Sequence, residues 1–239
     1  METTALGTLK RAYATCAQAT GRLLERVGIL DDEPPPRDHR LRHWAYSLTR
    51  AHDSIGISEL DVPWWTYGAI DAVEEWLAGR DGDVRVFEWG SGASTIWLAR
   101  RVASVRSVEH HGGFGTMIQE QLTAWPTARL DIVEPVPSDS PMISSAKEGH
   151  GRLDFTDYVR HIDTIDGPFG LIVIDGRARE ACLTAALDRL EPDGIIVFDN
   201  TLRRRYRRAI AVAPVAEKVY RGLTPTLPYP DQTSILRRR

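Results

Sequence analysis

The segment 84–109, VRVFEWGSGASTIWLARRVASVRSVE, constrains the fold more than any other part of the sequence. It opens with a β-branched and aromatic run that predicts a buried strand ending at Glu88. A Gly-Ser-Gly turn (90–92) then precedes a helical pattern, and a second short strand (105–108) ends at another acid, Glu109. Strand, glycine turn, helix, strand and acid follow one another in this order in nucleotide-binding βαβ units.

Two glycines and the second acid of this segment fit a nucleoside ligand. Gly90 and Gly92 allow the backbone to turn sharply and to approach a ligand without an intervening Cβ atom. Glu109 can accept hydrogen bonds from both ribose hydroxyls, and charged hydrogen bonds contribute about 1.5–3 kcal/mol each. A nicotinamide dinucleotide is disfavoured, because Ser94 stands in place of a third glycine and the Glu88 carboxylate would repel pyrophosphate. That carboxylate instead suits a cationic group such as an ammonium.

The acid-x-Gly-x-Gly turn resembles the first motif of the class I S-adenosylmethionine-dependent methyltransferases, and the resemblance covers about residues 84–200. The nearest group is bacterial, with E-x-G-S-G-x-S-T in this motif and IDGR in the fourth strand, which implies small-molecule or saccharide acceptors. The resemblance implies a Rossmann-like methyltransferase fold and S-adenosyl-L-methionine as cofactor, with Glu109 at its ribose. It also implies that Glu88, Gly90 and Gly92 lie at the methionine end of the cofactor. The full set of implied cofactor-binding residues is Glu88, Gly90, Ser91, Gly92, Ser94, Glu109 and His110.

Strand and helix patterns alternate from residue 84 onward. The later predicted strands are 129–133, 169–175 and 194–199, and the predicted helices are 93–103, 113–124, 155–164 and 178–190. Such alternation predicts the α/β class, with a doubly wound, mainly parallel sheet covered on both faces. The segment 232–236 alternates weakly and predicts a last edge strand.

Residues 1–62 predict an N-terminal helical extension, a lid or a dimer contact, ahead of a methyltransferase domain at 63–239. The acidic, proline-rich linker 31–36 divides the extension, because consecutive prolines cannot be helical.

Apolar residues recur at helical spacing in three segments near the N-terminus. One set precedes the proline-rich linker (Leu9, Cys16, Leu23, Val27 and Leu30) and a second follows it (Leu41, Trp44, Ala45 and Leu48). A third predicted helix runs from Trp64 to Leu77, with Pro63 at its start and Gly79 as its C-cap.

Composition is that of an ordinary globular enzyme. The chain has 239 residues, 42% of them hydrophobic, and a net charge of -3, which gives no global reason to expect a polyanionic partner such as nucleic acid. No apolar run approaches the length of a membrane span, and the N-terminus lacks the apolar core of a signal peptide. Cys16 and Cys182 have no metal-type spacing and are interpreted as buried thiols in a reducing compartment. The expected location is the cytoplasm.

Two further acids and an amide follow apolar strands. Asp175 ends the strand FGLIVID, and Asp199 and Asn200 end GIIVFDN. Because ligands bind at the carboxyl ends of parallel strands, these side chains are expected to meet the glycine turn. One interpretation is that they cap the following helices. The other is that the three oxygens hold one divalent cation, Mg²⁺ for example.

The second interpretation resembles the metal-dependent O-methyltransferases related to catechol methyltransferase and the macrocin-type sugar methyltransferases. There an Asp ends the fourth strand, here Asp175, and an Asp-Asp or Asp-Asn pair ends the fifth. The sequence departs from the catechol group at Ala178, where that group has a catalytic lysine. Neighbouring Arg177 and Arg179 stay protonated and are poor bases.

The general base that an alcohol acceptor requires is therefore sought among histidines. The candidates are His110, His111, His150 and His161. His150 is preferred because it lies in the long segment 136–154, the kind of loop that closes over a site. Asp175 and His150 are the predicted catalytic residues, and for each histidine a structural role is the competing interpretation.

Two more features have two interpretations each. The segment 202–208, LRRRYRR, is either a solvated basic helix start or a contact for an anionic substrate. Trp64, Trp65 and Tyr67 either pack the helices onto the sheet or form a wall for a sugar or aromatic acceptor.

The resulting hypothesis is an S-adenosylmethionine-dependent O-methyltransferase of a small-molecule or sugar-like acceptor, with a homodimer as an open possibility. Two alternatives stay open: a non-catalytic partner or scaffold protein with this fold, and a nucleic-acid N-methyltransferase. The second is disfavoured because Asp175-Gly176-Arg177 stands where such enzymes carry an Asn/Asp-Pro-Pro-aromatic signature. A scaffold, for its part, has no need of the intact glycine turn and its two acids.

Overall fold

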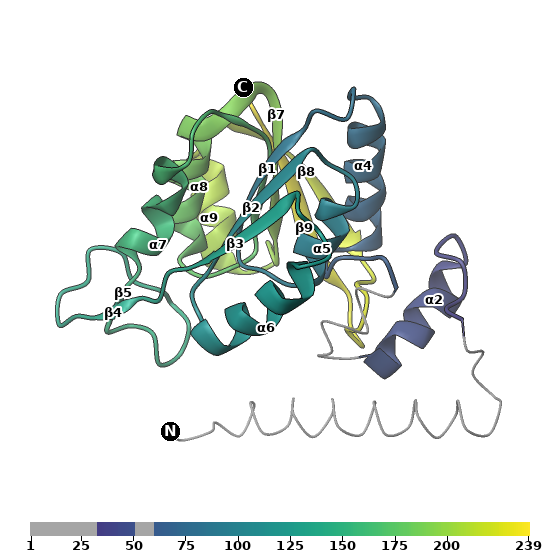
Figure 1. Ribbon diagram of the computed structural model, residues 1–239, viewed down its shortest axis with the longest axis horizontal. Helices are drawn as coiled ribbons and strands as arrows, with labels where there is room; N and C mark the ends of the chain where they lie inside the picture. The colour runs from purple at the N-terminus through teal and green to yellow at the C-terminus, as the bar shows by residue number, and fades with distance from the viewer. Residues whose placement is uncertain (1–32, 51–59) are drawn as a thin grey trace.

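A seven-stranded sheet forms the centre of the molecule, in the order β3-β2-β1-β6-β7-β9-β8 (Figure 1). The computed structural model describes residues 33–50 and 60–239. The strands are β1 (Arg85–Trp89), β2 (Ser104–Glu109), β3 (Ala128–Ile132), β6 (Phe169–Ile174), β7 (Leu190–Asp199), β8 (Val215–Gly222) and β9 (Asp231–Arg238). Neighbours among β3, β2, β1, β6 and β7 pair in parallel, whereas β9 runs antiparallel to both β7 and β8. The predicted α/β class and mainly parallel sheet are confirmed.

Helices cover both faces of the sheet. They are α4 (Tyr67–Ala78), α5 (Ala93–Ala99), α6 (Gly112–Leu122), α7 (Thr156–Arg160), α8 (Arg179–Arg189) and α9 (Arg204–Val212), with a 3-10 turn, η2 (His161–Thr164), after α7. Figure 1 shows α7, α8 and α9 on the left of the sheet and α4 on its right.

The two faces of the sheet carry separate apolar cores because side chains alternate along a strand. Val86 of β1 packs in the core under α4, α5 and α6, and the next residue, Phe87, packs in the core under α7, α8 and α9. All six residues of β6 are buried, as expected for a central parallel strand covered on both sides.

The end of the sheet differs from the prediction. The predicted edge strand 232–236 lies within β9, but β9 is an interior strand, and the edge is β8, which the sequence analysis did not predict. The alternation in β8 is weak because most of its side chains are exposed, so no periodic apolar pattern marks it.

Helix α4 also begins later than predicted. Thr66 is its N-cap and Pro63 precedes the helix, so Pro63 is not a first-turn proline. Gly79 is the C-cap, as predicted, and its N–H donates to the Glu75 carbonyl.

The described part of the N-terminal extension contains α2 (Arg40–Ser47) and the 3-10 turn η1 (Leu48–Arg50). The apolar stripe predicted here is wrong in part, because Leu41 and Ala45 are exposed. The buried residues of α2 are His43, Tyr46 and Ser47, and polar atoms of His43 and Ser47 bind residues outside α2. His43 Nδ1 lies 2.6 Å from Tyr67 Oη, and the Thr226 N–H donates to Ser47 Oγ at 2.9 Å. The first stripe and Cys16 lie outside the described residues.

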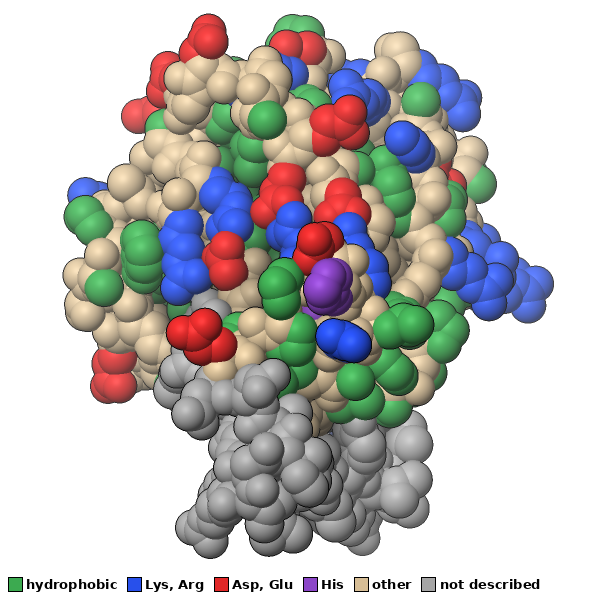
Figure 2. All heavy atoms as spheres, turned by 90° about the vertical axis from the view of Figure 1, so that its right-hand side faces the viewer, with side chains coloured by type: hydrophobic (Ala, Val, Ile, Leu, Met, Phe, Trp, Pro, Cys, Tyr) green, Lys and Arg blue, Asp and Glu red, His purple; other side chains and the backbone are tan. Residues whose placement is uncertain are grey.

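Ion pairs tie α2 and the segment before it to α4. Arg37 pairs with Glu74, and Arg40 pairs with Asp71. Figure 2 shows acidic and basic side chains interspersed on the side of the molecule that carries these helices. The polar character of this contact explains why an apolar pattern could not predict it.

The segment 136–154 is a loop, as predicted, closed at its base by two short antiparallel strands, β4 (Val136–Pro137) and β5 (Leu153–Asp154). Within the described residues, no helix is both long and apolar enough to cross a membrane. Cys182 is a buried free thiol.

Candidate functional site

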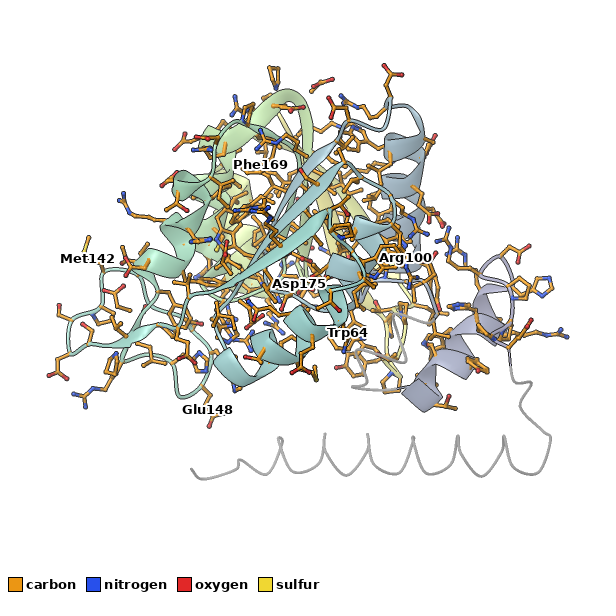
Figure 3. All side chains as sticks on the ribbon, viewed as in Figure 1. Trp64, Arg100, Met142, Glu148, Phe169 and Asp175 are labelled. Atoms are coloured by element: carbon orange, nitrogen blue, oxygen red, sulfur yellow. The ribbon has the colours of Figure 1, made fainter. Side chains whose placement is uncertain are left out.

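A cavity of about 660 Å³ opens at the carboxyl ends of β1, β2, β6 and β7. In Figure 3 the labelled Asp175 and Trp64 lie toward this lower edge of the sheet. The lining residues are Trp64, Gly90, Ser91, Gly92, Ala93, Ser94, Glu109, His110, His111, Phe114, Lys147, Asp175, Gly176, Arg177, Arg179, Asn200 and Arg203. The crevice between the adjacent strands β1 and β6 is the point where the strand order reverses, which is where ligands bind in open α/β sheets.

The glycine turn needs glycine for two reasons. Gly90 and Gly92 have φ angles of 99° and 148°, which other residues rarely adopt. A Cβ atom on Gly90 would also lie 3.0 Å from the backbone nitrogen of Gly176, in the turn that follows β6. The turns after β1 and β6 therefore touch through their backbones.

Glu88 lies beneath this turn and is fully buried. Its carboxylate accepts hydrogen bonds from the hydroxyls of Ser94, Thr95 and Ser107, at 2.5–2.6 Å. Burial raises the pKa of Glu88 to about 7, against the lowering effect of those hydroxyls. Glu88 thus holds the start of α5 to β2 and does not line the cavity, so direct contact with a cofactor stays a prediction.

Glu109 lines the cavity from the end of β2. One of its oxygens accepts from the backbone N–H groups of His110 and His111, both at 2.9 Å, and the other accepts from Ser91 Oγ at 3.2 Å. Burial raises the pKa of Glu109, but the imidazole of His110, 2.6 Å away, and the two backbone donors lower it further, so the net shift is downward. The carboxylate is therefore charged and rigidly oriented at the cavity wall.

Asp175 also lines the cavity, and it is paired with a buried arginine that the sequence analysis discounted as a base and gave no other role. Arg179 is 4% exposed, and its Nη2 donates to Asp175 Oδ1 at 2.7 Å and to the Asp175 carbonyl at 2.6 Å. Its Nη1 donates to the Asp199 carbonyl at 2.7 Å, and its Nε donates to the Gly176 carbonyl at 3.0 Å. One guanidinium therefore joins the ends of β6 and β7.

The three predicted metal ligands do not fit a divalent cation. Asp175 is neutralised by Arg179, Asp199 accepts from Thr233 Oγ1 at 2.7 Å, and the Asn200 amide donates to Asp231 at 2.8 Å. Burial and the charge of Asp175 raise the pKa of Asp199 well above its ordinary value, which favours a neutral group. Within residues 33–50 and 60–239, no group of three His, Cys, Asp or Glu side chains could hold a metal. These contacts disfavour the predicted magnesium site, because Arg179 supplies the positive charge beside Asp175.

The position of that arginine could have been anticipated. Arg179 follows Asp175 by four residues, across the turn into α8, so the sequence did show an opposite charge close to Asp175 along the chain.

His150 is placed beside the cavity rather than in its wall. Its ring stacks on Phe155, with centroids 5.8 Å apart, and lies 5.9 Å from the His110 ring, which does line the cavity. Burial, and after it the positive charge of Arg177, lowers the pKa of His150 to about 4, so the imidazole is neutral at physiological pH. His161 pairs with Asp131 at 2.9 Å, away from the cavity lining.

Of the aromatic residues 64, 65 and 67, one lines the cavity and two pack in the interior. Trp64 lines the cavity, whereas Trp65 is fully buried and packs edge-on against Trp97 at 5.7 Å. Tyr67 is buried as well, against His43. Trp64 alone is therefore available as a wall for an acceptor.

Comparisons with known proteins agree with this geometry. Residues 87–201 match a family model described as a methyltransferase domain, and no curated protein matches the sequence. Among solved structures, the chain is similar to an rRNA methylase from Streptococcus thermophilus (TM-score 0.50, 14% identity, 71% of this chain and 96% of that one). It is also similar to TrmN from Thermus thermophilus (TM-score 0.51, 14% identity, 76% of this chain and 49% of that one).

The fold is the Rossmann-like methyltransferase fold. The domain match and this fold together support an S-adenosylmethionine-dependent methyltransferase. At 14% identity the structural similarity shows the fold alone, so the acceptor has to be inferred from the residues of this chain.

Proposed function

We propose that this chain transfers the methyl group of S-adenosyl-L-methionine to an oxygen atom of a small or sugar-like acceptor. The observation that carries the proposal is the Glu109 carboxylate, held charged and oriented at the rim of a cavity whose floor is the Gly90–Gly92 turn. A carboxylate in this place accepts hydrogen bonds from two ribose hydroxyls, and the glycine turn, which has no side chains in the way, leaves room for the methionine part of the cofactor.

Two halves of the cavity would then have different ligands. The turns after β1 and β2 take the cofactor, and the turns after β6 and β7, together with Trp64, take the acceptor. When bound, the cofactor supplies an electrophilic methyl group, and the protein supplies alignment of the two reactants, which contributes on the order of 7–11 kcal/mol to a reaction of this type.

We propose that Asp175 accepts or orients the hydroxyl proton of the acceptor molecule, because its carboxylate is in the cavity wall between the two halves. His150 remains the second candidate, and its neutral imidazole would act through the neighbouring His110, which lines the cavity. The reaction is proposed without Mg²⁺, because Arg179 already neutralises the carboxylate that a metal would need.

A nucleic-acid acceptor is the less favoured alternative. The rRNA methylase from Streptococcus thermophilus shares the fold, but this chain has Asp175-Gly176-Arg177 in place of a base-binding Asn/Asp-Pro-Pro-aromatic signature. Its net charge of -3 also gives no global reason to expect a polyanionic partner.

Calorimetric titration with S-adenosylhomocysteine tests the cofactor class directly. We expect a micromolar Kd with one site per chain, equal in EDTA and in magnesium. No binding in either buffer would remove the proposed function and would favour a scaffold role for the fold. Turnover on a panel of sugar, phenolic and carboxylate acceptors then tests the acceptor class.

A further inference from the structure

We propose that Arg177 and Arg203 form a subsite for an anionic group, a carboxylate or a phosphate, on the acceptor. The inference rests on the proposed function and narrows its acceptor to small anionic molecules. It starts from the charges in the cavity wall, where four cationic side chains, Lys147, Arg177, Arg179 and Arg203, face two acidic ones, Glu109 and Asp175.

Both acids of the cavity are already engaged. Glu109 is held by His110, His111 and Ser91, and Asp175 is paired with Arg179. Within the described residues neither acid lies within ion-pair distance of Arg177 or Arg203. The cavity therefore presents positive charge that the protein itself does not neutralise.

Arg177 is the better defined of the two. It is half-buried, its Nη1 makes one long hydrogen bond of 3.4 Å to the Gly176 carbonyl, and its buried Nε has no hydrogen-bond partner in the described part of the chain. Leaving the N–H of a guanidinium buried and unpaired is costly. Burial and the nearby charge of Arg179 lower the pKa of Arg177, and the more distant charges of Glu109 and Asp175 offset this only in part.

Arg203 approaches the same cavity from the turn after β7, where it is the N-cap residue of α9. Its guanidinium contacts the Tyr206 ring at 5.7 Å and lies 3.4 Å from the Tyr206 hydroxyl. By contrast, Arg205 in the same basic run pairs with Glu180. The arginines of LRRRYRR therefore have different surroundings: Arg203 lines the cavity, and Arg207 is exposed on α9 outside the cavity lining.

Trp64 gives independent support for a ligand in this half of the cavity. Its indole Nε1 is a buried donor without a partner among residues 33–50 and 60–239, although its ring lines the cavity. A tryptophan presents a flat apolar surface, and a guanidinium donates paired N–H groups to carboxylate and phosphate oxygens. The wall fits a molecule with a planar or ring-shaped body and one anionic group.

The experiment measures phosphorus NMR line broadening of inorganic phosphate against the protein loaded with S-adenosylhomocysteine. We expect saturable binding, weakened about tenfold in Arg177→Gln and in Arg203→Gln, which is the loss of one charge-assisted hydrogen bond. Arg207→Gln removes the same charge from the same basic run and is expected to bind phosphate as the wild type does. Equal binding in all four proteins would mean adventitious surface binding and would overturn the proposal.

A second experiment tests whether Arg177 binds the acceptor or the cofactor, because the cofactor also carries a carboxylate. Arg177→Gln is expected to leave the Kd of S-adenosylhomocysteine unchanged. If that Kd rises while the Kd of methylthioadenosine, which lacks the carboxylate, does not, Arg177 binds the cofactor and the proposal is wrong. Binding of an RNA oligonucleotide that depends on both arginines, without binding of phosphate, would also overturn it.

Failure of this inference is distinguishable from failure of the proposed function. The phosphate titration can be repeated on the protein without S-adenosylhomocysteine, so the two arginines are testable even if no cofactor binds. Phosphate binding lost in both variants, with no S-adenosylhomocysteine binding, would sustain the subsite and remove the methyltransferase proposal.

Discussion

Glu88 and Glu109 lie near the carboxyl ends of the neighbouring strands β1 and β2, yet their carboxyl groups have opposite pKa shifts. Glu88 is surrounded by three hydroxyls and apolar side chains, and burial dominates. Glu109 accepts two backbone N–H groups and faces an imidazole, which outweighs its burial. One carboxyl therefore supports the turn, and the other is kept charged for a ligand.

The first prediction concerns stability and pH. The pKa of Glu88 rises on folding from an ordinary value of 4.5 to about 7, so the folded state holds a proton that the unfolded state has lost between these values. Stability therefore falls as pH rises through this range, by about 3 kcal/mol at about 1.4 kcal/mol per pKa unit. Relative to wild type, Glu88→Gln should gain stability from about pH 5 to about pH 8, measured by urea unfolding. A difference that does not change with pH would contradict the burial of a titrating carboxyl.

The second prediction concerns the cofactor. Glu109→Ala is expected to raise the Kd of S-adenosylhomocysteine by about tenfold or more, because charged hydrogen bonds to ribose are lost. Glu109→Gln keeps the size of the side chain and an acceptor for the backbone, and it should still weaken binding. Glu120→Ala removes an exposed acid of α6 and serves as the matched control. Unchanged affinity in both Glu109 variants would remove the ribose assignment.

At the scale of the elements, the contact between two turns limits what can be substituted. Gly90 has a φ of 99°, and its neighbour across the crevice is the backbone of Gly176. Gly90→Ala should destabilise the protein by about 1–3 kcal/mol and weaken S-adenosylhomocysteine binding, because a strained turn moves the cofactor floor. Gly151→Ala, where an added Cβ meets no atom within 4 Å, is the control for chain entropy. Thermal unfolding and calorimetry on the two variants provide the comparison, and equal effects would mean that the close contact is unimportant.

Most elements could be predicted because their apolar patterns are strong. β6 and the apolar half of β7 are buried on both faces, and continuous apolar runs mark such strands. β8 could not be predicted in this way, since an exposed edge strand needs no periodic apolar residues. The start of α4 was misplaced because Pro63 and Trp64 resemble a first helical turn, whereas Thr66 is the N-cap.

The sequence predicts which side chains lie together at the site, but it does not predict the partners that each of them binds. Glu109 and Asp175 lie in the cavity wall because strand order alone brings the carboxyl ends together. The partners of those acids depend on tertiary distances. Arg179 also donates to the Asp199 carbonyl of the neighbouring strand, and Ala178, the N-cap of α8, has a left-handed conformation with φ 48°; neither feature could be read from the sequence.

At the scale of the whole molecule, the guanidinium of Arg179 connects two neighbouring strands of the sheet. Arg179→Met should destabilise the protein by about 3 kcal/mol, because the partly exposed Asp175 loses its ion-pair partner and the carbonyls of Asp175, Gly176 and Asp199 lose a buried donor. Arg189→Met at the other end of α8 is the control and should cost far less, because this guanidinium donates to the Ile165 and Gly167 carbonyls and has no carboxylate partner among the described residues. Urea unfolding of both variants is the measurement, and similar losses would contradict the role of the ion pair.

The last prediction also concerns the molecule as a whole. Exhaustive dialysis against EDTA should leave both the Kd of S-adenosylhomocysteine and any turnover unchanged, and added magnesium or manganese should not raise them, because Arg179 neutralises Asp175 and the Asn200 amide is bound to Asp231. Turnover that falls in EDTA and recovers with magnesium would contradict this reading of the site.

A cation that is part of the chain has no dissociation constant. The charge that Arg179 provides is present in every folded copy, so it is not subject to metal starvation, chelation or loading with the wrong ion. It also sets a chemical limit, since a guanidinium donates hydrogen bonds but does not acidify a bound hydroxyl as a divalent metal does. An acceptor that already ionises readily near neutral pH suits such a site better than an ordinary alcohol.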